Sequence, residues 1–360
     1  MSKILIKNIT IQNPFADSFI ADILLENNKI VKIAENILIP DANIKDGSGK
    51  IITPGLIDRH IHGGYGCDFN TCSEDELQNC LINLKKHGVV AVLPTLMTDS
   101  VENINRQIAL LKTIRSKGAK ILGVHLEGVF INAKRKGIHP QKYILPLTLE
   151  NLNRFDAEFI KVLTYAPELD KNGEFLQELI NLGIIPSIGH SDASYDEAIS
   201  AIGFGVKQVT HLFNAMRPIH HREPSAIIAA INNNDVALEI IADLMHVHKA
   251  VLEMIFKSKA KDKILLISDA LPISYSAETE MIFGGQEIFY DGQKATSKDG
   301  VLAGSTLFLD DIYRKISDFV EFKDFIGFAS KNITRSLGIK DFPIVEVGAE
   351  FDLLHIWDKF

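Results

Sequence analysis

The 360-residue chain is predicted to be an α/β protein: a (β/α)8 barrel of the TIM type, with a small β-sandwich domain formed by its two ends. Two observations predict the barrel. Apolar runs rich in β-branched residues recur eight times along the middle of the chain, and helical segments alternate with them. The runs are continuously apolar, which is typical of parallel strands covered on both faces. A doubly wound open sheet is the alternative, but no G-x-G-x-x-G follows the first run.

The expected barrel strands are short segments that end close to polar residues. They lie at 56–62, 89–96, 120–127, 160–166, 184–189, 208–212, 237–242 and 263–268. A capping box, Ser73-Glu74-Asp75-Glu76, predicts that a helix begins there, and another helix is expected around 101–116. A long loop is expected at 128–147, and a hairpin at 282–301 before the last helix.

The two chain ends show strand patterns without helical periodicity. Short strands are expected at 4–6, 9–11, 20–25 and 30–33, the last two on either side of Asn27-Asn28, a pair that tolerates turn conformations. Another strand is expected at 351–357. We therefore expect residues 1–53 and 340–360 to form a small β domain, and residues 54–339 to form the barrel.

The composition narrows the class of protein. With 46% hydrophobic residues, 23% charged residues and a net charge of −8, the chain offers no basic surface for nucleic acid or an anionic membrane. Three cysteines argue against a disulfide framework. The first residues lack the apolar core of a signal peptide, and no stretch approaches the length of a membrane span. A cytoplasmic protein without nucleic-acid or membrane partners is expected.

Histidines and carboxylates stand at the ends of these predicted strands. They are His60, His62, Glu127, His190, His211 and Asp269. His60 and His62 are two residues apart, so their imidazoles point to the same face of a strand. Because the carboxyl ends of barrel strands meet at one rim, we expect these side chains to lie together and to form a metal site.

Imidazole and carboxylate ligands without thiolate suit Zn²⁺, Fe²⁺, Mn²⁺ or Co²⁺. Such an ion lowers the pKa of water towards neutrality, so that hydroxide can attack a carbonyl. Asp269 follows the last strand, where it can take a proton and pass it to a leaving nitrogen. A helix N-cap is the structural alternative for Asp269.

Several sequence blocks carry a resemblance to a known family. They are PGLIDRHIHGG (54–64), HLEGVFINAKRKGIHP (125–140), GHSDASYDEA (189–198), THLFNAMRPIHHREP (210–224), IADLMHVH (241–248), ISDA (267–270) and LAGS (302–305). Over nearly its whole length the chain resembles the N-acetylglucosamine-6-phosphate deacetylases of the amidohydrolase superfamily. The block at 210–224 distinguishes this family from dihydroorotases, hydantoinases and adenosine deaminases.

The resemblance implies a role for each matching residue. It implies Glu127, His190 and His211 as metal ligands and Asp269 as the acid/base. His60 and His62 allow a second metal site, so one or two divalent ions are expected, Zn²⁺ or Fe²⁺ ahead of Mn²⁺ or Co²⁺. The implied substrate-binding residues are Ile138, His139, Asn214, Ala215, Arg222, His246, Leu302, Ala303, Gly304 and Ser305. Of these, Arg222 and His246 would hold the phosphate, with Arg222 acting across the interface of a homodimer.

The implied reaction belongs to amino sugar metabolism. A metal-activated hydroxide with an Asp acid/base would convert N-acetyl-D-glucosamine 6-phosphate into D-glucosamine 6-phosphate and acetate. Three alternatives stay open: the galactosamine epimer as substrate, another cyclic amidohydrolase, and a sugar-phosphate sensor without turnover. The second would place a carboxylated lysine after the fourth strand, where this chain has Tyr165-Ala166-Pro167-Glu168. Two departures from the family pattern are Val129, where many members have proline, and Leu244, where glycine is frequent.

Overall fold

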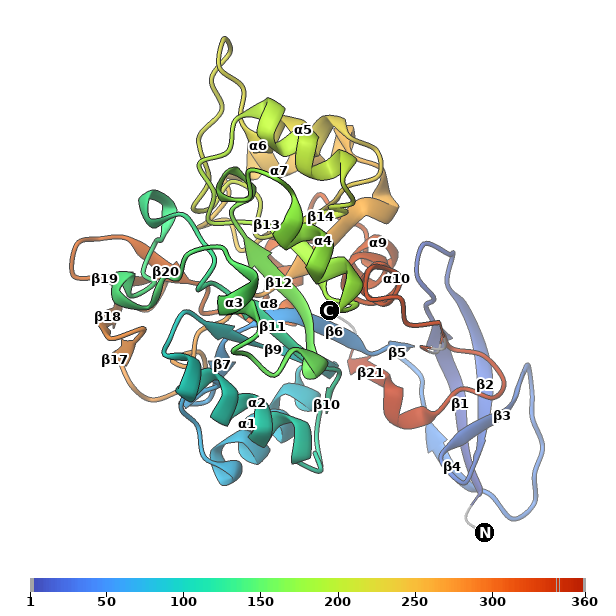
Figure 1. The fold of residues 1–360 in the computed structure, drawn as a ribbon. Helices are drawn as coiled ribbons and strands as arrows, with labels where there is room; N and C mark the ends of the chain where they lie inside the picture. Colours follow the sequence, from blue (N-terminus) through green and yellow to red (C-terminus); the bar gives the residue numbers. More distant parts are fainter. Residues whose placement is uncertain (1–2, 341, 343, 359–360) are drawn as a thin grey trace.

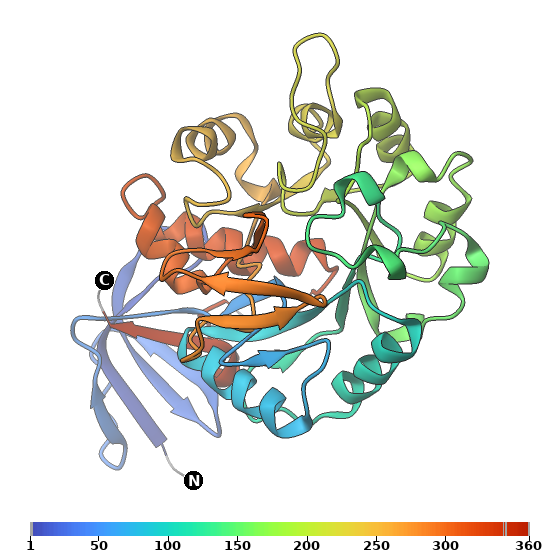
Figure 2. The ribbon, with the colours of Figure 1, turned by 90° about the vertical axis from the view of Figure 1, so that its left-hand side faces the viewer.

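Parallel strands form the barrel that the sequence predicts (Figures 1 and 2). The computed structural model describes residues 3–340, 342 and 344–358. The eight barrel strands are β6 (Leu56–Ile61), β9 (Val89–Met97), β11 (Val124–Glu127), β12 (Ile160–Tyr165), β13 (Ile185–Ile188), β14 (Gln208–Val209), β15 (Ala237–Ile241) and β16 (Ile264–Ile267). Each pairs in parallel with the next, and the Asp269 N–H donates to the His60 carbonyl at 2.8 Å, which links the last strand to the first.

Several strands end earlier than the apolar pattern predicts. The runs expected to reach residues 189, 212 and 268 end at Ile188, Val209 and Ile267. The reason is a left-handed backbone two residues beyond each end, at His190, His211 and Asp269, which a strand cannot continue through. The run expected at 120–127 is interrupted by Gly123 (φ +141°), so that β10 (Lys120–Ile121) and β11 are separate strands that both pair with β9.

Helices surround the barrel on its outer side (Figure 1). They are α1 (Glu74–Lys86), α2 (Val101–Thr113), α3 (Leu149–Leu152), α4 (Glu174–Asn181), α5 (Tyr195–Gly203), α6 (Ala226–Asn232), α7 (Lys249–Ser258), α8 (Leu309–Ile316), α9 (Phe322–Ile326) and α10 (Asn332–Ser336). The predicted capping box is confirmed: Ser73 and Glu76 each accept a backbone hydrogen bond from the other. No helix in the described part of the chain is both long and apolar enough to cross a bilayer.

The two chain ends form a separate small sheet, as predicted. Its strands are β1 (Lys3–Ile11), β2 (Phe19–Glu26), β3 (Lys29–Ala34), β4 (Asn43–Asp46), β5 (Lys50–Pro54) and β21 (Leu354–Asp358). The C-terminal β21 pairs antiparallel with β5, and Asn27 and Asn28 form the β2–β3 turn with φ of +50° and +63°. The expected strands 4–6 and 9–11 are one bulged strand. The domain boundaries at 53/54 and 339/340 stay a prediction, and residues 341, 343, 359 and 360 lie outside the described residues.

The segment before α8 is larger than the single hairpin predicted at 282–301. It is a four-stranded antiparallel meander of β17 (Glu280–Phe283), β18 (Gln286–Tyr290), β19 (Ala295–Ser297) and β20 (Leu302–Gly304). Its buried side chains Phe283 and Ile288 pack with Met97, at the carboxyl end of β9, and with Leu271, in the loop after β16. The meander therefore packs against the mouth of the barrel through these side chains.

A second small hairpin, β7 (Gly63–Gly64) with β8 (Cys67–Asp68), follows the first barrel strand. Cys67 lies in it, and Cys72 and Cys80 come shortly after. All three thiols are buried and free. This agrees with the expectation that the chain has no disulfide framework.

Gly88 lies where α1 ends and β9 begins, and it contacts the C-terminal strand. Its φ is +79°, and a Cβ there would lie 2.3 Å from the Trp357 ring. We expect Gly88→Ala to destabilise the protein by about 2–5 kcal/mol, because left-handed strain adds to overpacking. The change would be measured as a lower urea midpoint.

Gly203→Ala is the matched control, since a Cβ at that helix end meets no atom within 4 Å. We expect its midpoint to equal or exceed that of the wild type. Equal midpoints for Gly88→Ala and the wild type would contradict the packing described here.

Candidate metal centre

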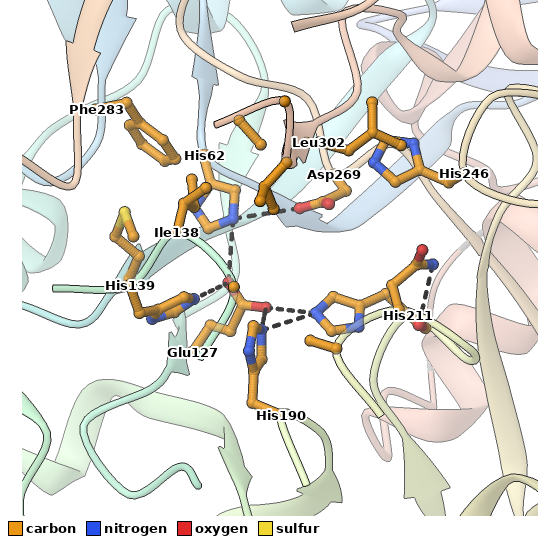
Figure 3. Close-up of a pocket in the computed structure, with 18 residues that line it drawn as sticks. His62, Glu127, Ile138, His139, His190, His211, His246, Asp269, Phe283 and Leu302 are labelled. Atoms are coloured by element: carbon orange, nitrogen blue, oxygen red, sulfur yellow. Dashed lines mark hydrogen bonds and ion pairs between the residues drawn. The ribbon is translucent and has the colours of Figure 1, made fainter. Parts of the chain in front are cut away.

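The Glu127 carboxylate, at the end of β11, is the centre of the predicted site (Figure 3). Its Oε1 lies 2.8 Å from His211 Nε2, 3.1 Å from His190 Nε2 and 3.4 Å from His60 Nε2. Its Oε2 lies 3.1 Å from His62 Nε2. The structure thus brings together residues from four different strand ends, as the sequence predicts.

Asp269 completes the cluster from the last barrel strand. Its Oδ1 lies 3.3 Å from His60 Nε2 and 3.2 Å from His62 Nε2. His190, His211 and Asp269 have φ values of +46°, +27° and +52°. Such conformations are costly for residues other than glycine and are frequent at functional sites. Two of the predicted ligands and the predicted acid/base therefore lie on strained turns at the barrel rim.

Hydrogen bonds on the far side of three imidazoles fix their tautomers. Each Nδ1 donates to an oxygen that can only accept: the Glu239 carboxylate for His60 (3.2 Å), the Thr95 carbonyl for His62 (3.2 Å) and the Arg135 carbonyl for His190 (2.9 Å). With the hydrogen on Nδ1, each neutral ring presents the lone pair of Nε2 to the carboxylates. Metal-ligating histidines are held in this way.

His139 has the opposite arrangement. Its Nδ1 accepts a hydrogen bond from the Thr98 N–H at 3.3 Å and lies 2.7 Å from the Thr98 hydroxyl. The hydrogen of the neutral ring is therefore on Nε2, which lies 3.7 Å from Glu127 Oε2. Burial, and next the charge of His190, lower the pKa of His139 to about 4. His139 thus presents a neutral hydrogen-bond donor to the site.

The donor atoms of the cluster fit a divalent cation. Burial alone would raise the pKa of Glu127 and of Asp269, but the charge of His60 and imidazole hydrogen bonds hold both well below the usual range. Burial would lower the pKa of His62, yet hydrogen bonds to the same carboxylates raise it to about 9. Positive charge between these groups is therefore favoured, and a divalent ion can supply it in place of protons. Nitrogen and oxygen donors suit Zn²⁺, Fe²⁺, Mn²⁺ or Co²⁺.

A buried ion pair lies beneath the cluster, and the sequence did not predict it. Arg59 Nε lies 2.9 Å from Glu239 Oε1, both side chains are fully buried, and Arg59 Nη1 donates to Ser336 Oγ. Glu239 in turn holds His60. The available signal was a single carboxylate within the apolar strand β15.

A cavity of about 420 Å³ opens above the cluster, within the range of small-molecule sites. Predicted substrate-binding residues that line it are Ile138, His139, Asn214, Ala215, His246, Leu302, Ala303 and Gly304. Lining residues that the sequence reasoning missed include Met97, Gly137, Phe283, Gly300 and Val301. Most of these belong to the meander and to strand β9, whose place at the mouth only the fold reveals.

Two predicted substrate-binding residues do not line this cavity. The backbone N–H of Ser305 donates to the Asp269 carbonyl at 2.9 Å, so Ser305 supports the neighbouring turn. Arg222 is exposed, on the segment between β14 and α6 that projects from the barrel in both ribbon views (Figures 1 and 2). Its Nη1 lies 2.8 Å from His221 Nε2.

His246 lies at one side of the cavity (Figure 3). Its Nδ1 lies 2.8 Å from Asp243 Oδ2. Burial lowers the pKa of His246, but the hydrogen bond and the charge of Asp243 outweigh burial and raise it above the ordinary value. Leu244 stands where glycine is frequent in the family that the chain resembles, and its φ is +66°. A positive imidazolium at this position suits an anionic ligand.

Comparisons with known proteins agree with this geometry. Residues 51–359 match the model of the Amidohydrolase family. The chain belongs to the amidohydrolase family. This amidohydrolase is 34% identical to the N-acetylglucosamine-6-phosphate deacetylase of Bacillus subtilis (strain 168), over 86% of this chain and 82% of that protein.

Two further similarities bear on this amidohydrolase. It is 29% identical to the N-acetylgalactosamine-6-phosphate deacetylase of Escherichia coli O157:H7, over 86% of this chain and 85% of that protein. It superposes on the crystal structure of N-acetyl-D-glucosamine-6-phosphate deacetylase from Mycobacterium smegmatis with a TM-score of 0.88, 26% identity and coverage of 99% and 96%.

The Arg59–Glu239 pair gives a stability prediction. Glu239→Leu leaves the Arg59 guanidinium buried without its counter-charge, and we expect the free energy of unfolding to fall by about 3–5 kcal/mol. Chemical denaturation followed by circular dichroism measures this loss.

The double variant Arg59→Met with Glu239→Leu is the control. It removes both charges while keeping similar volume, and we expect it to recover most of the lost stability. If the single variant is as stable as the wild type, the ion pair does not hold this part of the barrel.

Proposed function

We propose that this amidohydrolase hydrolyses N-acetyl-D-glucosamine 6-phosphate to D-glucosamine 6-phosphate and acetate. The observation that carries the proposal is the opposed tautomers: His60, His62 and His190 present lone pairs, whereas His139 presents an N–H to the same centre. Hydrolysis of an amide requires both kinds of group side by side. The lone pairs would hold the ion that activates water, and the N–H faces the carbonyl oxygen. The names of the relatives, 34% and 32% identical, support the same substrate.

We propose that Glu127, His190 and His211 hold a divalent ion, Zn²⁺ or Fe²⁺ ahead of Mn²⁺ or Co²⁺. The close approach of both imidazole Nε2 atoms to one carboxylate oxygen supports this ligand set. His60 and His62, whose Nε2 atoms lie 3.4 and 3.1 Å from the Glu127 carboxylate, would provide donors for a second ion. When bound, such an ion lowers the pKa of water and polarises a carbonyl.

The side chains around the centre carry the proton transfers. Asp269 accepts a proton from the attacking water and later donates it to the amine nitrogen that leaves. The His139 Nε2–H donates a hydrogen bond to the acetyl oxygen as negative charge develops on it. Asp269 follows β16 and His139 lies in the loop after β11, so each group can reach the amide from its own side.

The phosphate is held by His246 and by Arg222 acting across the interface of a homodimer. A sugar phosphate carries about two negative charges, and arginine recognises them through charge-assisted hydrogen bonds. The exposed, projecting position of Arg222 and its absence from the residues that line the cavity of its own chain support action in trans. The reaction is placed in the amino sugar metabolism of the cytoplasm.

The galactosamine epimer is the second candidate substrate, since one relative is named for it at 29% identity. The comparison of kcat/KM for the two acetamido sugar 6-phosphates decides between them. A higher value for the galactosamine compound would replace the proposed substrate and keep the chemistry.

Asp269→Asn keeps the size of the side chain and removes its ability to accept a proton. We expect kcat to fall by about 10³-fold, within the 10²–10⁴ range of general acid–base catalysis, with the metal content unchanged. Acetate release and elemental analysis measure the two quantities. Glu127→Ala is the contrasting variant and should lose metal and turnover together; full turnover in Asp269→Asn rules out the proton transfer.

Arg222→Ala tests recognition of the phosphate. We expect kcat/KM for the 6-phosphate to fall by about 10-fold to 100-fold, the equivalent of one or two charge-assisted hydrogen bonds, with activity on the unphosphorylated sugar unchanged. His220→Ala, on the same exposed segment, is the control and should behave as the wild type.

Mixing two impaired subunits tests the interface. Dimers formed from Arg222→Ala and Asp269→Asn chains regain the wild-type kcat/KM at one of their two sites only if Arg222 acts on the partner's cavity. No recovery in verified mixed dimers rules out action across the interface.

A further inference from the structure

We propose that Thr98 is a positioning residue that keeps the hydrogen of His139 on Nε2, facing the reaction centre. The kinetic part of this inference rests on the proposed function. Thr98 follows β9 directly, and its hydroxyl oxygen lies 2.7 Å from His139 Nδ1. Both side chains are buried, with 1% and 3% exposure, so water does not compete for this contact.

Two backbone N–H groups set the direction of the Thr98 hydroxyl bond. The backbone N–H of Val129 donates to Thr98 Oγ1 at 2.9 Å, which occupies one of the two acceptor positions of that oxygen. The Thr98 N–H donates to His139 Nδ1 at 3.3 Å, so this nitrogen presents a lone pair, and the hydroxyl hydrogen is directed to the same nitrogen. Two donors facing Nδ1 exclude a hydrogen on it.

The backbone at 128–129 is shaped around this pair of side chains. A Cβ on Gly128 (φ +118°) would lie 2.1 Å from Thr98 Oγ1 and 2.8 Å from His139 Nδ1. Val129 has a φ of +55° and uses its N–H as the donor to Thr98. Proline could supply neither, since its φ is fixed near −65° and it has no N–H. Val129 stands where many members of the family have proline. Its N–H is therefore part of the hydrogen-bond arrangement around the Thr98 hydroxyl.

Two backbone hydrogen bonds hold the position of the His139 segment. The His139 N–H donates to the Lys136 carbonyl at 3.0 Å, and Gln286 Nε2 in β18 donates to the Ile138 carbonyl at 2.7 Å. On the side of the cavity, His139 Nε2 faces Glu127 Oε2 at 3.7 Å. The centroids of the His139 and His190 rings are 4.5 Å apart. Thr98 is thus the group that holds the Nδ1 side of the ring, opposite the carboxylate that faces Nε2.

The experiment compares Thr98→Val, which keeps the shape and loses the hydroxyl, with Thr98→Ser, which keeps the hydroxyl. For Thr98→Val we expect kcat to fall by about 10-fold to 100-fold, with KM within about 3-fold and the metal content unchanged, because one donor to Nδ1 persists and a fully lost oxyanion donor costs more. For Thr98→Ser we expect kcat within about 3-fold of the wild type. An unchanged kcat in Thr98→Val, or equal losses in both variants, overturns the role of the hydroxyl.

Nitrogen NMR of the zinc-loaded protein, labelled with ¹⁵N-histidine, provides a readout that does not depend on turnover. The His139 signals are identified by their loss in His139→Asn. In the wild type we expect the hydrogen on Nε2, and in Thr98→Val a population with the hydrogen on Nδ1. A hydrogen on Nδ1 in the wild type overturns the proposal. If the wild type has the expected tautomer but does not release acetate, the proposed function fails and the positioning by Thr98 stands.

Discussion

The convergence of imidazoles on the buried Glu127 carboxylate is the constraint on which the rest of the site depends. Its oxygens lie within 3.7 Å of five histidine nitrogens, from His60, His62, His139, His190 and His211. A carboxylate buried in this way is costly unless it is paired and hydrogen-bonded. Each imidazole must therefore present a defined edge, and that edge depends on what lies behind the ring.

The groups behind the rings come from the barrel and its loops. Glu239, on the interior of β15, holds His60 and is itself neutralised by Arg59. A carbonyl at the end of β9 holds His62, and a carbonyl in the loop after β11 holds His190. The barrel therefore does more than bring six side chains to one rim, because it also decides which nitrogen of each ring faces the centre. The meander β17–β20 then closes one side of the cavity with Phe283 and Leu302 (Figure 3).

Two residues that depart from the family pattern share an unusual backbone conformation. Val129 and Leu244 both have left-handed backbone conformations, with φ of +55° and +66°. A β-branched residue such as Val129 is rare there, so the surrounding contacts must hold it. Its N–H bond to Thr98 and its carbonyl, which accepts from the Leu145 N–H at 2.7 Å, are two such contacts.

The sequence by itself determined the barrel, the pairing of the chain ends and the six residues at the strand ends. Continuous apolar runs report burial on both faces, and the residue after each run marks the rim, so these features are local in the chain. The extent of the meander, the exposure of Arg222, and the roles of Arg59, Glu239 and Thr98 required the tertiary structure. His60 and Glu239 are 179 residues apart, and Thr98 and His139 are 41 apart. A hydrogen-bond partner at such a separation leaves no periodic signal, and only the closed barrel decides which nitrogen carries the hydrogen in His60, His62, His139 and His190.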